Sequence, residues 1–535
     1  MSRATEQLIM SSVVMVLTLA GPACGRAPDS TESGAAAPTL ATAATGSRLE
    51  RVRLAFTQVD DLFTRFAEQS HAPGIAWGVV LDGELVHTGA TGFRDVASRA
   101  PIDRDTVFRI ASMTKSFTAL SILKLRDEGR LALDEAAERY VPELAGLAYP
   151  TTDSPKITIR HLLSHSEGFP EDNPWGDRQL ARTDAEMDEM MRAGIPFSTS
   201  PGTTYEYSNF GFAILGRIVA NVSGQPYAAY VAEQILQPLG LASTTLEAGD
   251  VPADRLAHGY RWQDDAWLDE PPLPDGSFGS MGGMLTSTTD LGRYVAFLMS
   301  AWPPRDEADT GPVRRASRRE MQQVWRIRPA TVRRTNDGAT ALFSGGYGYG
   351  LRISQTCEFG QIVAHTGGLP GYGSVMTWLP EYGLGVFAMV NLTYTSASGV
   401  ANDALSLIVR TAGLSPLKPT PSPALLEARD AVNRLLSEWD DTLATEIAGD
   451  NLYLDEAMDR RRRAIDALQA EHGACRANDD FDVENALRGQ WTLTCDRGAM
   501  LVAITLAPTT PPKVQHLDVR SIEPGAPTRL PTCGN

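Results

Sequence analysis

The first cluster of reactive side chains along the chain is Ser112-Met113-Thr114-Lys115. On a helix, residues three apart share a face, so the Lys115 amine can approach the Ser112 hydroxyl. A serine hydroxyl becomes a good nucleophile when a base takes its proton, and lysine can be that base if burial and nearby positive charge lower its pKa toward neutrality. At the start of a helix, Ser112 would also have backbone N–H groups aimed at developing negative charge. The pair therefore predicts a serine nucleophile activated by lysine.

The same spacing has plainer explanations. Ser112 could be an ordinary helix N-cap, because serine commonly occupies that position. The spacing also recurs at Ser415 and Lys418, which we set aside because they lie in a proline-rich segment. The prediction therefore depends on the two clusters that follow Ser112 in the chain.

The second cluster, Tyr207-Ser208-Asn209, lies 95 residues after Ser112 in a loop before an apolar helix pattern at 212–219. A phenol can shuttle a proton, and an amide can hold a substrate carbonyl. The third cluster, His365-Thr366-Gly367-Gly368, follows a predicted strand at 361–365. Glycines there let a substrate backbone lie against the strand edge, and the Gly368 N–H can join that of Ser112 as an oxyanion hole.

In this order the three clusters resemble those of the penicillin-recognising serine hydrolases, and most closely the branch of class C β-lactamases and D-alanyl-D-alanine carboxypeptidases. The resemblance covers about residues 51 to 412, with matching phrases at 159–165, 280–285 and 346–350. It implies that Ser112 attacks and that Lys115 and Tyr207 exchange protons. Since nothing in the sequence matches the deacylating glutamate of class A enzymes, water activation is assigned to Tyr207. The resemblance further implies that Asn209 orients the acyl amide, while His365 and Thr366 present donors to a substrate carboxylate.

The third cluster departs from the β-lactamases of this branch, which usually carry lysine where His365 stands. Histidine has an unperturbed pKa of about 6.5, so we expect its charge to change within the physiological range. The leading function is hydrolysis of D-amino-acid peptides or related amides, of carboxypeptidase or aminopeptidase type, with weak β-lactamase activity. The alternatives are an esterase of the same fold and a catalytically retired receptor for peptides or β-lactams.

The pattern around these clusters predicts an α+β fold. A helix is expected at 52–66 and a hairpin at 75–87, with strands returning at 348–354, 361–365, 374–379 and 385–391. The resemblance implies an antiparallel sheet flanked by helices, with a helical subdomain. Four prolines in 415–423 indicate a linker. Beyond it, one helix is expected from 425 to 447 and another at 455–471, followed by three strands.

We therefore divide the chain into a signal peptide at 1–24, a disordered tether at 25–50, a hydrolase domain at 51–414, a proline-rich linker at 415–424 and a small accessory α+β domain at 425–535. The apolar stretch 8–20 is shorter than the roughly 20 residues that span a bilayer, which is typical of an export signal. Export predicts a periplasmic or cell-envelope location. Lipid anchorage through Cys24 and simple cleavage are equally open.

Composition limits the partners. A formal charge of −17 argues against nucleic acid, so the expected partner is a small peptide, amide, ester or β-lactam substrate. We expect no cofactor and no metal: no cysteine pair has C-x-x-C spacing, and His161 and His165 are interpreted as packing residues. Cys475 and Cys495 are the first candidates for a disulfide, and Cys357 is expected to be a buried thiol.

Overall fold

The computed structural model describes residues 46–334 and 340–523. The predicted signal peptide, Cys24 and most of the predicted tether lie outside the described residues. The tether ends earlier than predicted, because helix α1 (Arg48–Arg53) already begins at Arg48, where Ser47 and Glu50 form a capping box. Among the helices that the structure describes, none is long and apolar enough to cross a membrane.

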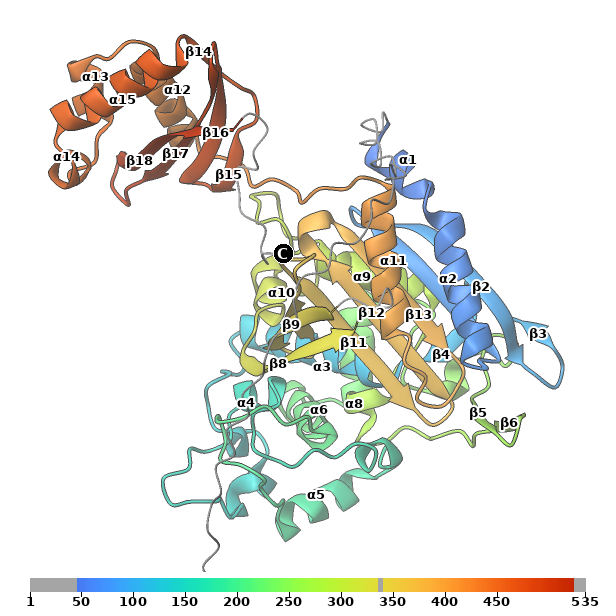
Figure 1. Ribbon diagram of the computed structural model, residues 1–535. Coiled ribbons are helices and arrows are strands. Elements are labelled where there is room, and N and C mark those ends of the chain that lie inside the picture. Colours follow the sequence, from blue (N-terminus) through green and yellow to red (C-terminus); the bar gives the residue numbers. More distant parts are fainter. Residues whose placement is uncertain (1–45, 335–339, 524–535) are drawn as a thin grey trace, which may run out of the picture. The chain divides into compact units, whose positions relative to one another are not determined.

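A nine-stranded antiparallel sheet organises the larger part of the chain (Figure 1). Its order is β3-β2-β1-β13-β12-β11-β10-β9-β8, so strands from the two ends of this region meet at the β1–β13 pair. The strands are β1 (Gly74–Leu81), β2 (Glu84–Asp95), β3 (Ala100–Pro101), β8 (Arg326–Arg334), β9 (Thr340–Tyr347), β10 (Arg352–Gln355), β11 (Ile362–Leu369), β12 (Tyr372–Leu379) and β13 (Leu384–Val390). The predicted α+β class and the meeting of early and late strands are confirmed.

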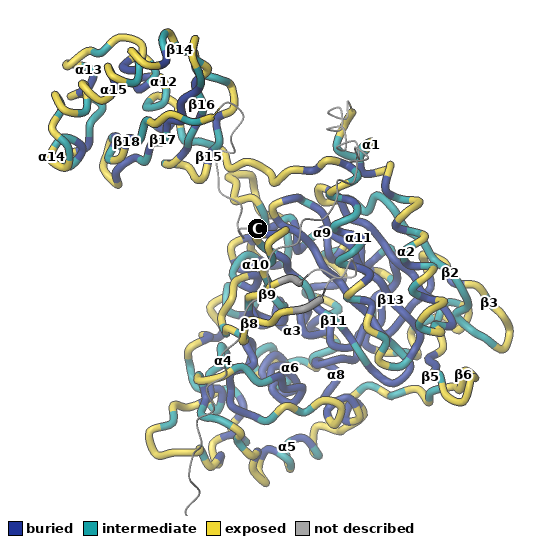
Figure 2. Tube along the Cα trace, in the orientation of Figure 1, coloured by how far each residue is buried: buried dark blue, intermediate teal, exposed yellow. Residues whose placement is uncertain are grey.

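Each face of this sheet carries its own apolar core, because side chains alternate along a strand. In β1, Ile75, Trp77 and Val79 pack with helices α2 (Phe56–Gln69) and α11 (Ser398–Thr411). Their neighbours Ala76 and Val80 pack on the opposite face with helix α9 (Thr288–Met299). Figure 2 shows the result as a continuous buried interior along β13. With both faces covered, the central strands are held rigidly in place.

A helical region lies between strands β4 (Val107–Arg109) and β7 (Leu285–Ser287), which pair with each other. It begins with a one-turn 3₁₀ helix, η1 (Ala111–Met113), that runs directly into α3 (Thr114–Asp127). Helices α6 (Asn209–Ser223) and α8 (Gly279–Gly282) pack against α3. This region also contains α4 (Ile159–Leu163), α5 (Asp184–Ala193), α7 (Tyr227–Val231), β5 (Tyr260–Gln263) and β6 (Ala266–Asp269), and α10 (Arg315–Met321) follows it in the chain.

The C-terminal part forms a separate antiparallel sheet with its own core around the fully buried Trp491. Its strands are β14 (Cys475–Ala477), β15 (Asp482–Asn485), β16 (Arg488–Cys495), β17 (Gly498–Leu506) and β18 (Val514–Ile522), and its helices are α12 (Pro423–Ser437), α13 (Asp441–Ile447), α14 (Leu452–Asp455) and α15 (Met458–His472). The single helix predicted at 425–447 is wrong. Helix α12 ends at Ser437. The Asp440 carboxylate then accepts hydrogen bonds from the N–H groups of Thr442 and Leu443 and caps the next helix, α13.

Of the two expectations for the cysteines, one is confirmed and one is wrong. Cys475 and Cys495 face each other on β14 and β16 and form the expected disulfide. Cys357 is exposed and disulfide-bonded, so the expectation of a buried thiol is wrong. Because Cys357 stands in the loop after the short strand β10, its backbone lies at the surface.

Candidate active site

Ser112 lies in η1, at the point where the chain turns from β4 into α3. The residue before it, Ala111, has a φ of +49°, a left-handed conformation that a residue with a Cβ rarely adopts. The Thr114 hydroxyl donates to the Ala111 carbonyl and accepts from the Met284 N–H, which holds the turn against the neighbouring chain. Ser112 is 7% exposed whereas Lys115 is 0% exposed, so solvent reaches the hydroxyl but not the amine.

The Lys115 amine makes three contacts that fix its direction. Its Nζ lies 3.1 Å from Ser112 Oγ, 2.7 Å from Asn209 Oδ1 and 2.8 Å from the Met281 carbonyl. The last two oxygens are acceptors, so a neutral amine donates its two protons to them. The lone pair is then left for the Ser112 hydroxyl. The predicted Ser112–Lys115 contact is confirmed, and Met281 is a partner that the sequence did not reveal.

Burial lowers the pKa of Lys115 to about 7. The positive charge of Arg352 contributes to this lowering, while the carboxylates of Asp177 and Asp172 oppose it. Burial also raises the pKa of Asp177 to about 6. A lysine that is partly neutral at physiological pH can accept a proton from serine.

Asn209 is held by a set of polar side chains from the loop before α5. The Asp172 carboxylate accepts from the backbone N–H groups of Asn209 (2.6 Å) and Phe210 (2.8 Å), which caps α6. The Asn209 amide donates to Asn173 Oδ1 at 2.6 Å, so its carbonyl oxygen is turned toward Lys115. Asp172 and Asn173 carry no sequence pattern that would have identified them.

Tyr207 lies beside the Ser112–Lys115 pair. Its ring lies 4.9 Å from Lys115 Nζ, and its phenol is close enough to Ser112 for that side chain to lower its pKa. Burial raises the pKa of Tyr207 well above its usual value, so the group stays protonated and is suited to relay a proton rather than to act as a free phenolate base. His165 supports this segment, because its Nδ1 accepts from the Ser208 N–H and its ring packs 4.3 Å from that of Tyr207.

The two histidines near α4 make contacts within the protein. His161 Nδ1 accepts from the Thr158 N–H at the start of α4, and His165 is enclosed by aromatic rings. In the described part of the chain, no group of three or more metal-binding side chains comes together.

His365 is fully buried, and its charge state differs from the one expected from the sequence. Its Nδ1 lies 2.7 Å from the Thr366 carbonyl, which can only accept, so Nδ1 carries the proton. Its Nε2 accepts from the Tyr347 hydroxyl at 2.8 Å. Burial, with the charges of Arg352 and Lys115, lowers the pKa of His365 well below 6.5. The prediction that His365 changes charge within the physiological range is therefore wrong.

The other residues of the third cluster lie beside the nucleophile. They belong to β11, which continues to Leu369 rather than ending at His365 as predicted. Gly367 packs so closely against η1 that a Cβ there would lie 2.1 Å from the Ile110 carbonyl oxygen. Thr366 and Gly368 remain half-buried. Strand β10 pairs with β11 only up to Ala364, so beyond it this edge of β11 has no paired strand among the described residues.

Replacing Gly367 with alanine should displace β11 from η1, because the blocking atom is a backbone carbonyl oxygen that cannot rotate away. We expect a loss of about 1–3 kcal/mol in stability, as for other overpacked sites, and loss of most turnover. Thermal unfolding and steady-state kinetics measure the two effects. Gly399→Ala is the matched control, because a Cβ there meets nothing within 4 Å. Wild-type stability and turnover in Gly367→Ala would contradict this close packing.

Arg352, on β10, is a site residue that the sequence reasoning missed. Its guanidinium carbon lies 6.0 Å from the centre of the Tyr207 ring, and its charge acts on Lys115, Tyr207 and His365. Because His365 is neutral, Arg352 is the positive charge suited to a substrate carboxylate beside the open edge of β11. Because Arg352 stands alone, outside the three clusters, the sequence pattern did not identify it as a site residue.

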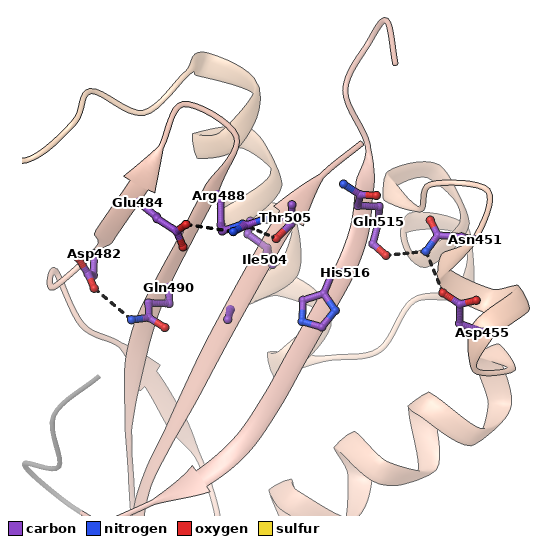
Figure 3. Close-up of a pocket in the computed structure, with 12 residues that line it drawn as sticks. Asn451, Asp455, Asp482, Glu484, Arg488, Gln490, Ile504, Thr505, Gln515 and His516 are labelled. Atoms are coloured by element: carbon purple, nitrogen blue, oxygen red, sulfur yellow. Dashed lines mark hydrogen bonds and ion pairs between the residues drawn. The ribbon is translucent and has the colours of Figure 1, made fainter. Parts of the chain in front are cut away.

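The C-terminal sheet contains a polar cavity of about 540 Å³ (Figure 3). Its polar groups pair with one another: Glu484 contacts Arg488 at 3.0 Å, and Asp482 accepts from Gln490 at 3.1 Å. Neither serine nor lysine lines it. The cavity therefore offers no counterpart to the Ser112–Lys115 pair.

Comparison with known proteins gives consistent findings. A family model described as Beta-lactamase matches residues 59–410. The chain is 28% identical to protein flp of Staphylococcus aureus (strain COL) over 337 residues, which is 63% of each chain. It is 27% identical to penicillin-binding protein 4* of Bacillus subtilis (strain 168), over 55% of this chain and 62% of that protein. The chain thus spans less than two thirds of the length of these curated relatives.

Among solved structures, the octameric penicillin-binding protein homologue from Pyrococcus abyssi is similar in fold. The TM-score is 0.55 at 22% identity, and the match covers 84% of this chain and 90% of that one.

Proposed function

Because the chain belongs to the β-lactamase family, whose members are generally serine hydrolases, we propose that it forms an acyl-enzyme on Ser112 and hydrolyses D-amino-acid peptides or related amides. The observation that carries the proposal is the position of the Lys115 amine. It lies 3.1 Å from Ser112 Oγ, with two carbonyl oxygens holding its other hydrogens. Together with the lowered pKa of Lys115, this geometry supports an active enzyme over a retired receptor.

The acylation step follows from these contacts. Lys115 takes the Ser112 proton as Oγ bonds to the substrate carbonyl carbon, and the N–H groups of Ser112 and Gly368 hold the oxyanion. The C–N bond then breaks, and the proton passes from Lys115 through the Tyr207 hydroxyl to the leaving amine. In deacylation, a water proton travels back through Tyr207 to Lys115 while the water oxygen attacks the ester. Ser112 recovers its proton as the acid leaves.

Arg352 supports a substrate that carries a carboxylate beyond the scissile bond. A guanidinium binds a carboxylate through two parallel hydrogen bonds. A substrate backbone lying along the open edge of β11 would place its terminal carboxylate toward Arg352. This is the feature that favours a carboxypeptidase type over a general esterase.

A turnover panel tests the choice among these functions. We expect a D-alanyl-D-alanine peptide to be hydrolysed with a higher kcat/KM than nitrocefin, and Ser112→Ala to abolish both reactions. Turnover of p-nitrophenyl acetate alone would instead establish the esterase alternative. A stable adduct with no turnover of any substrate would establish the receptor.

The rate of acylation should depend on pH through Lys115. Its neutral form is the base and predominates above a pKa of about 7, so kcat/KM should rise about tenfold per pH unit below 7 and level off above it. A neutral ester is the proper substrate, because its own charge does not change. A profile that is flat or falling between pH 5 and 8 would contradict Lys115 as the base.

We also propose an exported, cell-envelope location from the N-terminal sequence pattern. The measurement is the N-terminus of the mature protein together with metabolic labelling by a fatty acid. Labelling that disappears in Cys24→Ala would establish a lipid anchor, and an unprocessed N-terminus would contradict export.

A further inference from the structure

Three arginines lie beside the candidate active site on strands β8 and β10, which pair with the two edges of β9. Arg326 and Arg328 belong to β8 and Arg352 to β10. The register places Arg326 and Arg352 on either side of Tyr347, the residue that donates to His365. We call Arg352, Arg328 and Arg326 the arginine row.

Two members of the arginine row lie beside tyrosine rings, at increasing distance from Ser112. Arg352 lies by the Tyr207 ring, while the Arg328 guanidinium carbon lies 5.0 Å from the centre of the Tyr205 ring. Tyr205 packs 5.8 Å from Tyr347. The charges of Arg352 and Arg328 both act on Tyr205 and on His165, and only that of Arg352 reaches His365. Arg328 is therefore farther from the nucleophile than Arg352.

Nothing in the described part of the chain neutralises these three charges. Their side chains make no hydrogen bond or ion pair there, and the Nε atoms of Arg326 and Arg352 are buried without an acceptor. By contrast, the nearby Arg160 is paired with Asp134 at 2.6 Å.

The acidic side chains close to Tyr205 do not pair with the arginine row. Burial raises the pKa of the fully buried Glu167 well above its usual value, so that carboxyl stays protonated. Glu206 accepts from the Ser198 hydroxyl and the Glu171 N–H, and the Glu171 carboxylate accepts from Asn173. Half-buried guanidinium groups without counter-charges are costly, and arginine is well suited to carboxylate and phosphate ligands.

We propose that Arg328, with Arg326 behind it, forms a second anion subsite, so that the preferred leaving group carries a second anionic group beyond the carboxylate at Arg352. This inference rests on the proposed function, because it assigns the arginine row to the leaving-group side of Ser112. The shared chemistry is a carboxylate or phosphate on the side chain of the released D-amino acid.

Matched leaving groups test the subsite directly. The substrates are acyl-D-alanyl peptides ending in D-glutamate or its neutral isostere D-glutamine, and in O-phospho-D-serine or D-serine. We expect kcat/KM to favour the anionic member of at least one pair by roughly tenfold, mainly through KM, as for one hydrogen bond to a charged group. A larger ratio for the phosphoserine pair identifies phosphate, and a larger ratio for the glutamate pair identifies carboxylate. Ratios near one in both pairs would overturn the proposal.

Variants of Arg328 show whether the preference comes from this residue. Arg328→Gln should bring the ratio close to one, and Arg328→Lys should retain part of it. Arg65→Gln, an exposed arginine on α2, is the control and should keep the wild-type ratio. An unchanged ratio in Arg328→Gln would overturn the assignment.

Binding separates failure of this inference from failure of the proposed function. In Ser112→Ala, calorimetry compares N-acetyl-D-glutamate with N-acetyl-D-glutamine, and O-phospho-N-acetyl-D-serine with N-acetyl-D-serine. Tighter binding of an anionic ligand that is lost in Ser112→Ala/Arg328→Gln supports the subsite even if no amide is hydrolysed. Equal binding within both pairs overturns it even if amides are hydrolysed.

Discussion

Replacing Lys115 with methionine is expected to lower kcat/KM by about 10²–10⁴-fold, the usual contribution of a positioned general base. Methionine preserves the length and burial of the side chain but removes the amine between Ser112 Oγ, Asn209 Oδ1 and the Met281 carbonyl. The hydroxyl then has no group to accept its proton. Steady-state hydrolysis of a neutral ester measures the effect without any contribution from substrate charge.

Lys124→Met is the matched control for this change. Lys124 lies on the same helix, α3, but its amine pairs with Glu128 at 2.9 Å instead of facing Ser112. We expect turnover close to that of the wild type and a small loss of stability, since ion pairs near the surface contribute little. A folded Lys115→Met protein with turnover within threefold of wild type would show that another group activates Ser112.

Arg352→Gln is expected to lower kcat/KM for a carboxylate-bearing peptide by roughly 10–100-fold more than for a neutral ester. The physical reason is the loss of a charge-assisted hydrogen bond to the substrate, worth about 1.5–3 kcal/mol. The same change should move the pH at which Lys115 loses its proton upward, because the Arg352 charge lowers that pKa. Kinetics with both substrates across pH measure the two effects together.

His365→Gln tests whether His365 or Arg352 binds the substrate carboxylate. The His365 imidazole is neutral and both its nitrogens have partners within the protein, so it carries no charge for the substrate. We expect its replacement to affect acidic and neutral substrates alike. If His365→Gln selectively impaired the acidic substrate and Arg352→Gln did not, the assignment of the carboxylate to Arg352 would be wrong.

Sequence spacing predicted the reactive pair because a helix fixes local geometry. Residues three apart share a face, and Ser112 and Lys115 are indeed in contact across the η1–α3 junction. The hairpin predicted at 75–87 similarly corresponds to β1 and the first part of β2. The Tyr207 and Gly367 clusters were found through their order along the chain. The packing of α6 against α3 brings the first beside Ser112, and strand β11 brings the second.

The electrostatic partners could not be predicted in the same way. Asp172 and Arg352 are single charged residues whose positions depend on contacts between distant segments. The charge state of His365 depends on its burial beneath Tyr347, which no local pattern expresses. A histidine with its unperturbed pKa was therefore the wrong reference for this position.

Strands β8 and β9 were missed because their local sequence opposes a strand. Pro329 lacks an N–H, but β8 is the edge of the sheet, where that donor is dispensable. Gly345 and Gly346 weaken strand propensity in β9, yet side chains at these positions would collide with the backbone of β10 and β8. Tertiary pairing thus overrides the local signal in the strands that carry Arg326, Arg328 and Tyr347.

The most direct test of the account is the site of covalent modification. The intact protein is treated with a fluorophosphonate or a fluorescent penicillin, digested and mapped by mass spectrometry. We predict a single adduct on Ser112, which disappears in Ser112→Ala and forms more slowly in Lys115→Met. An adduct on another residue, or equal labelling of Ser112→Ala, would contradict Ser112 as the nucleophile.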